Sequence, residues 1–206
     1  MKINKIKKTT LFILVILLII GLVFLALITI LKNQKSPTLP ITASSTSKNK
    51  IVSTPDCPIE TAEEEVRGTS MEPLIKNGDM VIVYKGYEKC NEFKKGDLVI
   101  YKFAGHDTPL IKMVRAVSGD KFELKENEQK NWNIYINNEI LKNSQNQAYE
   151  LNENTYKMLK NYATDYPTIP TDTYLILGEE TGGSIDSTKF GLVGKSGIIG
   201  LAEIKK

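Results

Sequence analysis

Histidine is almost absent from this chain of 206 residues, which contains only His106. A Ser-His-Asp triad would have to rest on that residue, which lies between Gly105 and Asp107 in a stretch typical of a surface turn. A serine nucleophile in this protein therefore needs another base, and a neutral amine can take that role. Cysteine is also scarce. Cys57 and Cys90 could form one disulfide or remain two unpaired buried thiols, and the sequence leaves both open.

A strong overall charge is absent as well. The formal net charge is +3, but residues 1–35 carry six lysines and no acidic residue, which leaves 21 basic against 24 acidic residues in the rest. A mildly acidic domain offers no electrostatic surface for nucleic acid, so we expect no nucleic-acid partner. No internal repeat is evident, and we expect neither a metal nor a cofactor.

One long hydrophobic run is present. Residues 9–31 carry no charge, and such a run of about 23 residues is roughly 34 Å long as a helix, enough to cross a bilayer. Four lysines precede it and indicate that the N-terminus stays in the cytoplasm. A cleavable signal peptide is the alternative, but its apolar core should span only about 7–15 residues and no small-x-small site follows promptly. We therefore favour a permanent anchor.

The domain organisation follows from this anchor. Residues 32–56 are rich in Ser, Thr, Pro and Lys and lack periodicity, which is typical of a flexible linker. We predict a basic cytoplasmic N-terminus (1–8), a transmembrane helix (9–31), this linker (32–56) and an extracytoplasmic domain (57–206). The protein would be a single-pass protein of the cell membrane, with the lipid bilayer as a partner.

The exported domain is predicted to be mainly β. Short apolar runs bounded by Gly, Asp, Asn or Pro are typical of strands, and they occur at residues 80–84, 98–103, 110–117, 132–136, 173–177 and 198–202. Asn137-Asn138 is typical of a hairpin turn. Only residues 152–162 have a helical pattern, with Asn152 or Asn154 as the candidate cap. We expect an antiparallel β domain with barrel-like packed sheets and a small helical insertion.

Ser70 and Lys112 are the candidate catalytic pair. Ser70 follows the flexible Gly68, where backbone amides can approach a substrate carbonyl. Lys112 shares one face of a predicted strand with Leu110 and Val114, because side chains alternate along a strand. The side chain could extend so that its amine reaches solvent. Alternatively, burial could lower the pKa of the amine from about 10.4 toward 8 and make it a base.

Three sequence blocks resemble those of bacterial type I signal peptidases, the membrane-bound serine–lysine peptidases of the S26 family. Residues 66–84 (VRGTSMEPLIKNGDMVIVY) match the nucleophile block at Ser70, Met71, Pro73 and Gly78-Asp79. Residues 110–120 (LIKMVRAVSGD) resemble the lysine strand, and residues 177–193 (LGEETGGSIDSTKFGLV) resemble the C-terminal Gly-Asp-Asn…Ser-x-Asp-Ser-Arg block. The resemblance covers residues 64–202 and indicates a divergent member.

The resemblance implies a role for each matching residue. Ser70 would be the nucleophile and, through its backbone amide, an oxyanion donor, while Lys112 would be the general base. Ser184 would orient the lysine amine, and Asp186 would be a structural aspartate near the site.

Several positions depart from the family pattern. Because Thr188 stands where the family has the arginine that pairs with the aspartate, Asp186 would need another partner: Arg115, Lys189 or solvent. Gly68 removes the side-chain donor that some members add to the oxyanion hole. The remaining departures are Leu74, Met113 and the pair Glu179-Glu180.

The implied activity is removal of signal peptides from exported preproteins, by an enzyme that acts as a monomer. The substrate would lie as an extended strand with small side chains in shallow apolar pockets, so that cleavage follows an Ala-x-Ala type sequence. The candidate wall residues, each of which could equally be ordinary core, are Val66, Met71, Ile75, Leu110 and Ile111. Two alternatives remain: a maturation peptidase of conjugation or pilin systems with the same Ser/Lys blocks, and a catalytically silent relative that acts as an assembly module.

Overall fold

The structure is a computed structural model that describes residue 51 and residues 53–104 and 108–205. The predicted cytoplasmic segment, the predicted transmembrane helix, most of the predicted linker and His106 lie outside these residues. Within residues 51–205, apart from the gaps at 52 and 105–107, no helix is both long and apolar enough to span a membrane. The described chain belongs to one compact unit that begins at Ile51, shortly before the predicted boundary.

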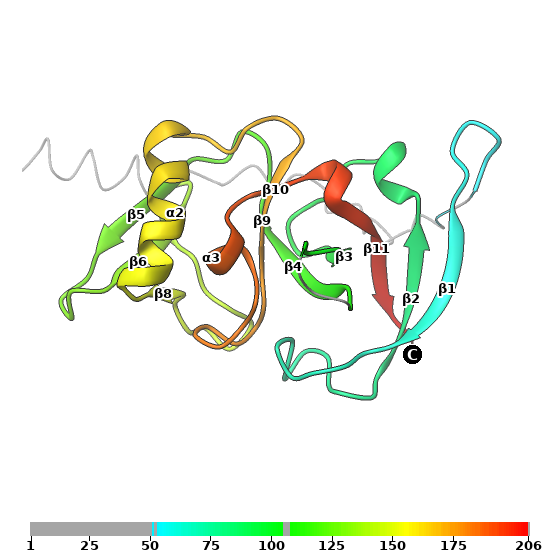
Figure 1. Ribbon diagram of the computed structural model, residues 1–206, viewed down its shortest axis with the longest axis horizontal. Helices are drawn as coiled ribbons and strands as arrows, with labels where there is room; N and C mark the ends of the chain where they lie inside the picture. Colours follow the sequence, from blue (N-terminus) through cyan, green and yellow to red (C-terminus); the bar gives the residue numbers. More distant parts are fainter. Residues whose placement is uncertain (1–50, 52, 105–107, 206) are drawn as a thin grey trace, which may run out of the picture. The chain divides into compact units, whose positions relative to one another are not determined.

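Two antiparallel sheets form the domain (Figure 1). The larger has the strand order β1-β2-β11-β3-β4-β9-β10, with bounds Glu60–Glu65 (β1), Met80–Lys85 (β2), Ile198–Ile204 (β11), Leu98–Tyr101 (β3), Leu110–Ala116 (β4), Thr173–Leu177 (β9) and Val193–Gly194 (β10). The smaller pairs β6 with three strands: Phe122–Glu126 (β5), Trp132–Ile136 (β6), Glu139–Ile140 (β7) and Glu150–Leu151 (β8). The prediction of a mainly antiparallel β fold is confirmed.

Short helices complete the domain. The helix α2 (Glu153–Asp165) begins after Asn152, whose side chain accepts hydrogen bonds from the amides of Asn154 and Thr155. Its buried Leu159 packs into the hydrophobic core of the smaller sheet, so the predicted helical insertion is confirmed. The other helical segments are single turns: η1 (Tyr87–Lys89), α3 (Ser187–Phe190) and η2 (Lys195–Gly197).

Gly-Asp turns precede strands of both sheets. Gly78 adopts a positive φ of 89° just before β2, a conformation that glycine takes without steric cost. The carboxylate of Asp79 accepts a hydrogen bond from the amide of Lys76 and so closes the turn. Asp97 closes the turn before β3 and Asp120 the turn before β5 in the same way. The Asn137-Asn138 turn between β6 and β7 also has positive φ values, as a tight hairpin requires.

A disulfide joins Cys57 to Cys90, which resolves the question that the sequence left open. Cys57 precedes β1, and Cys90 follows η1 at the end of β2. β1 is an edge strand without a fully buried side chain, so few apolar contacts hold it. The disulfide therefore fixes the start of an edge strand whose other end leads to Ser70.

Candidate active site

Ser70 lies in the loop that connects β1 to β2. The two ends of this loop are joined, because the amide of Val66 donates to the carbonyl of Asp79 and the amide of Gly78 donates to the carbonyl of Val66. The side chains of Met71 and Ile75 anchor the loop, because both are buried in a hydrophobic core cluster of the domain. The loop thus holds Ser70 half-buried at a fixed place.

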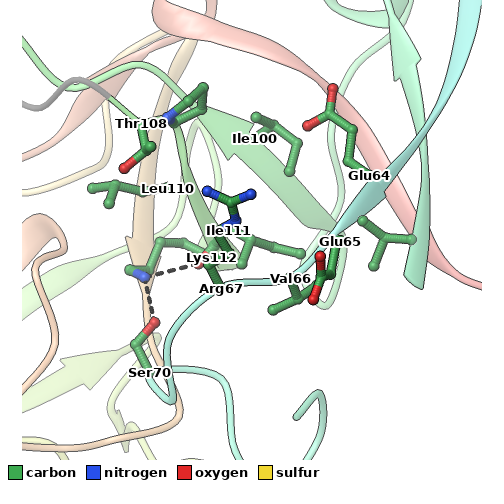
Figure 2. Close-up of a pocket in the computed structure, with 12 residues that line it drawn as sticks. Glu64, Glu65, Val66, Arg67, Ser70, Ile100, Thr108, Leu110, Ile111 and Lys112 are labelled. Carbon is green, nitrogen blue, oxygen red and sulfur yellow. Dashed lines mark hydrogen bonds between the residues drawn. The ribbon is translucent and has the colours of Figure 1, made fainter. Parts of the chain in front are cut away.

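Lys112 occupies the middle of β4, between β3 and β9. Its side chain is only 2% exposed. The amine nitrogen lies 2.7 Å from the Ser70 hydroxyl oxygen and 2.8 Å from the Ile111 carbonyl oxygen (Figure 2). Ser70 and Lys112, the pair expected from the sequence, are in direct hydrogen-bonding contact.

The electrostatic surroundings of Lys112 favour its neutral form. Burial lowers the pKa of its amine from 10.5 to about 8, because removing a charge from water is costly, while the charge of Asp186 opposes this effect. A neutral amine has a lone pair that can accept the Ser70 proton. The hydrogen bond then runs from the serine O–H to the lysine nitrogen, whereas an ammonium donates to the serine oxygen instead.

A cleft of about 400 Å³ opens beside this pair (Figure 2). Of the wall residues expected from the sequence, Val66, Leu110 and Ile111 line it. Met71 and Ile75 do not line it, because their side chains point into the core that supports the Ser70 loop. The remaining lining residues, besides Ser70 and Lys112, are Glu64, Glu65, Arg67, Val81, Ile100, Thr108 and Pro109.

Asp186 pairs with neither Arg115 nor Lys189, the charged partners expected from the sequence, and it is not exposed to solvent. It is 1% exposed, and its carboxylate accepts hydrogen bonds from the amide of Gly178 (2.9 Å) and from the amide and hydroxyl of Thr188 (3.0 and 2.8 Å). Thr188, where the family has arginine, is itself a partner through its hydroxyl. Three hydrogen bonds satisfy this buried carboxylate without a cation.

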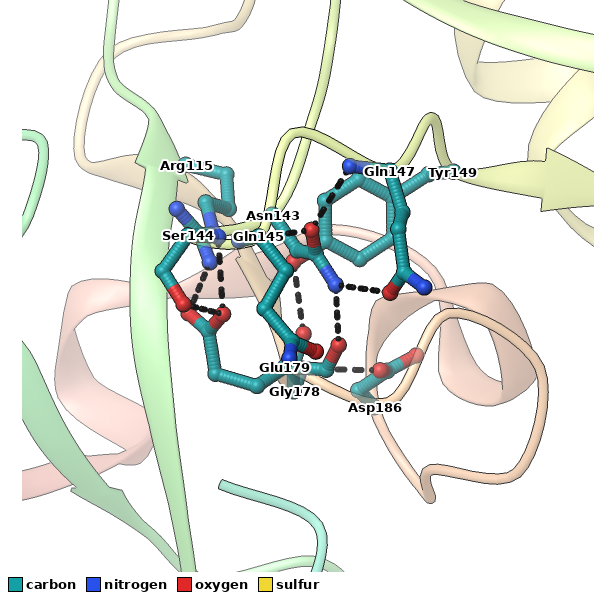
Figure 3. A network of polar contacts seen from close by, with 9 residues as sticks. All are labelled: Arg115, Asn143, Ser144, Gln145, Gln147, Tyr149, Gly178, Glu179 and Asp186. Carbon is teal, nitrogen blue, oxygen red and sulfur yellow. Dashed lines mark hydrogen bonds and ion pairs between the residues drawn. The ribbon is translucent and has the colours of Figure 1, made fainter. Parts of the chain in front are cut away.

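Arg115 pairs instead with Glu179, which is buried (Figure 3). The second carboxylate oxygen of Glu179 accepts from the amide and hydroxyl of Ser144, at 2.9 and 2.6 Å. The ion pair links β4 to the segment that follows β9. In the sequence, Glu179 is visible only as a departure from the family pattern, which does not indicate this pairing.

Ser184 does not make the hydrogen bond to the lysine amine that the sequence led us to expect. Its hydroxyl oxygen is buried and has no hydrogen-bond partner among the described residues. A Cβ atom on Gly178 would lie 2.4 Å from that oxygen, so the Ser184 hydroxyl is packed against the Gly178 backbone. The Ile111 carbonyl, rather than Ser184, is the second group that the lysine amine contacts.

The backbone of Ser70 is also held in place. Its carbonyl oxygen accepts hydrogen bonds from the amides of Glu179 (2.8 Å) and Glu180 (3.3 Å). Its own amide makes no hydrogen bond to any other residue that the structure describes, which leaves that donor available to a bound group. The site therefore combines a hydroxyl, an adjacent buried amine and an uncommitted backbone donor, the parts that acyl transfer requires.

The sequence matches the family model described as signal peptidase, peptidase S26, over residues 59–205. The chain belongs to the S26 signal peptidase family. It is 29% identical to signal peptidase I P of Bacillus subtilis subsp. natto over 147 residues, which cover 68% of this chain and 73% of that protein. It is 33% identical to signal peptidase IB of Staphylococcus aureus (strain COL) over 148 residues, 66% of this chain and 72% of that protein.

A crystal structure of a signal peptidase I from Enterococcus faecalis superposes with a TM-score of 0.39 at 20% identity, over 54% of this chain and 97% of that one. Identities near 30% to the curated relatives agree with a divergent member of the S26 signal peptidases. The protein is thus a hydrolase, a serine peptidase of the signal peptidase I type, which acts in signal-peptide processing.

Proposed function

We propose that this signal peptidase cleaves preproteins with Ser70 as nucleophile and Lys112 as general base. The observation that carries the proposal is the 2.7 Å contact between the Ser70 hydroxyl and an amine that is buried and has a lowered pKa. Few lysines are buried, because an ammonium loses much hydration there, and such a lysine beside a hydroxyl is suited to proton transfer.

The reaction would proceed in two steps. In acylation, the Ser70 proton moves to the lysine nitrogen as the serine oxygen bonds to the scissile carbonyl carbon; the ammonium then returns this proton to the leaving amine as the C–N bond breaks. In deacylation, Lys112 takes a proton from a water that attacks the ester, and the proton returns to the serine oxygen. The Ser70 amide would stabilise the oxyanion, and Gly68 can add no side-chain donor.

We infer that the cleft receives the small side chains before the cut, as the family resemblance implies. Its apolar wall side chains are Val66, Val81, Ile100, Leu110 and Ile111. The end of β1 and the start of β4 line the same cleft, and an extended peptide beside them could place alternate side chains against that wall. We infer cleavage of the Ala-x-Ala type.

The protein is proposed to work as a monomer anchored by residues 9–31, with the peptidase domain outside the cytoplasm. The Cys57–Cys90 disulfide supports this location, because disulfides persist in oxidising compartments. Both residues of the pair are retained and in contact, which favours a peptidase over a catalytically silent assembly module.

The direct test is cleavage of an Ala-x-Ala precursor by the full chain in detergent. Ser70→Ala and Lys112→Ala should each lower kcat/KM by at least about a thousandfold, since nucleophile and base act as one unit. Lys157→Ala removes a lysine on α2, remote in sequence from the cleft, and should cleave at the wild-type rate. Wild-type cleavage by either site variant would refute the assignment of these roles.

A further inference from the structure

The segment 178–180, directly after β9, supports the nucleophile from one side. Two of its amides, those of Glu179 and Glu180, donate to the Ser70 carbonyl. A displacement of this segment would move Ser70 relative to Lys112. Because proton transfer and nucleophilic attack depend steeply on distance, whatever holds residues 178–180 affects the reaction.

The loop between β7 and β8 of the smaller sheet contacts this segment at two backbone carbonyls (Figure 3). The side-chain amide of Asn143 donates to the Glu179 carbonyl at 2.9 Å, and the hydroxyl of Tyr149 donates to the Gly178 carbonyl at 2.6 Å. The same loop contributes Ser144 to the Glu179 carboxylate. Gly178 and Glu179, which lie beside the nucleophile, are therefore held by hydrogen bonds from the loop of the smaller sheet.

Both donors are fixed in their own surroundings. The side-chain oxygen of Asn143 accepts from the amides of Gln145 and Gln147, at 3.0 and 2.9 Å, so the loop is closed around Asn143. Tyr149 is 1% exposed and belongs to the core cluster of the smaller sheet. A hydrogen-bond donor that is fixed in this way can hold the segment 178–180 in one position, whereas a donor on a mobile loop could not.

We propose that Asn143 and Tyr149 are positioning residues for Ser70, and that the smaller sheet contributes to catalysis through them. This inference rests on the proposed role of Ser70. Neither residue touches the cleft, and each acts through the segment 178–180.

Tyr149→Phe is the main test, because it keeps the ring in the core and removes only the hydroxyl. We expect kcat to fall about tenfold while KM changes by less than about twofold, since the cleft itself is untouched. Hydrogen exchange of the Glu179 amide, which donates to Ser70, should become faster. Tyr135→Phe is the matched control: it removes a hydroxyl from β6 of the same sheet that makes no hydrogen bond to another described residue.

Asn143→Asp is a second variant. Aspartate keeps the acceptor that closes the loop but lacks the donor to the Glu179 carbonyl, so kcat should fall with KM nearly unchanged. Gln145→Glu places the same charge on the same loop, and its side chain makes no hydrogen bond within the described part of the chain; it should behave as wild type.

Unchanged kcat and unchanged Glu179 exchange in both variants would overturn the inference, and so would a raised KM at constant kcat. Failure of the proposed function gives a different result, because then Ser70→Ala itself would cleave. The exchange measurement reports the position of the segment whether or not Ser70 is the nucleophile.

Discussion

Lys112 is a buried cation-forming side chain whose hydrogen-bond partners among the described residues are a hydroxyl and a carbonyl. Its lowered pKa couples function to stability. An unfolded lysine has a pKa near 10.5 and the folded one about 8, so between these values the unfolded state binds more protons. The stability contributed by this group therefore rises as the pH increases from about 8 to 10.5, and the charged amine weakens the fold at neutral pH.

Lys112→Met should accordingly melt at a higher temperature than wild type at pH 7, because methionine removes the cost of burying a charge while keeping the volume. The advantage should shrink as the pH rises through the range from about 8 to 10.5. Thermal unfolding of both proteins across this range measures it. A variant that is less stable than wild type at pH 7 would show that burial of the charged amine does not destabilise the fold.

At the scale of elements, the sequence predicted the strands that are rich in apolar residues. The six apolar runs all became strands, with ends within a few residues of those expected, because their β-branched and apolar residues pack on a pleated surface. β1 was missed because its sequence, ETAEEE, has no apolar alternation. It is a strand through pairing with β2 and through the ion pairs Glu64–Lys85 and Glu63–Lys205.

The residues of the candidate site also fall into those that the sequence could predict and those that it could not. Ser70 and Lys112 could be found because their local blocks are distinctive, and Val66, Leu110 and Ile111 because they lie in the same blocks. The wall positions of Met71 and Ile75 were wrong, since a sequence does not show which way a loop side chain turns. The partners of Glu179 and the contacts of Asn143 and Tyr149 depend on how two sheets meet, which no local pattern specifies. Asp186 instead caps the short helix α3 and accepts from Thr188, a local contact that the expectation of a charged partner missed.

The disulfide acts on an element, the edge strand β1. Replacing both Cys57 and Cys90 by serine should lower the free energy of unfolding by about 4 kcal/mol, because the bond closes a loop of 33 residues in the unfolded chain. The KM for the precursor should also rise, since the end of β1 lines the cleft. Chemical denaturation and steady-state kinetics of the double variant test both effects; unchanged stability would contradict the role given to the disulfide.

At the scale of the whole molecule, the proposed anchor would hold the peptidase domain at the membrane. A domain with a slight acidic excess has no electrostatic attraction to an anionic lipid surface, so residence at the membrane would depend on residues 9–31. We expect the full chain to stay with membranes after extraction at alkaline pH. Protease added outside intact cells should reach the domain but not the N-terminus. Release of the chain by alkaline extraction would contradict the anchor.

The most direct test of the central claim is the dependence of kcat/KM on pH, because the proposed mechanism requires an uncharged Lys112. Below the pKa of about 8 the amine carries a proton and cannot accept one from Ser70. We therefore predict that kcat/KM of the full-length enzyme falls about tenfold for each pH unit below that value and levels off above it. Lys157→Ala should retain the same profile. A profile that stays flat between about pH 6.5 and 9 would contradict the role of Lys112 as general base.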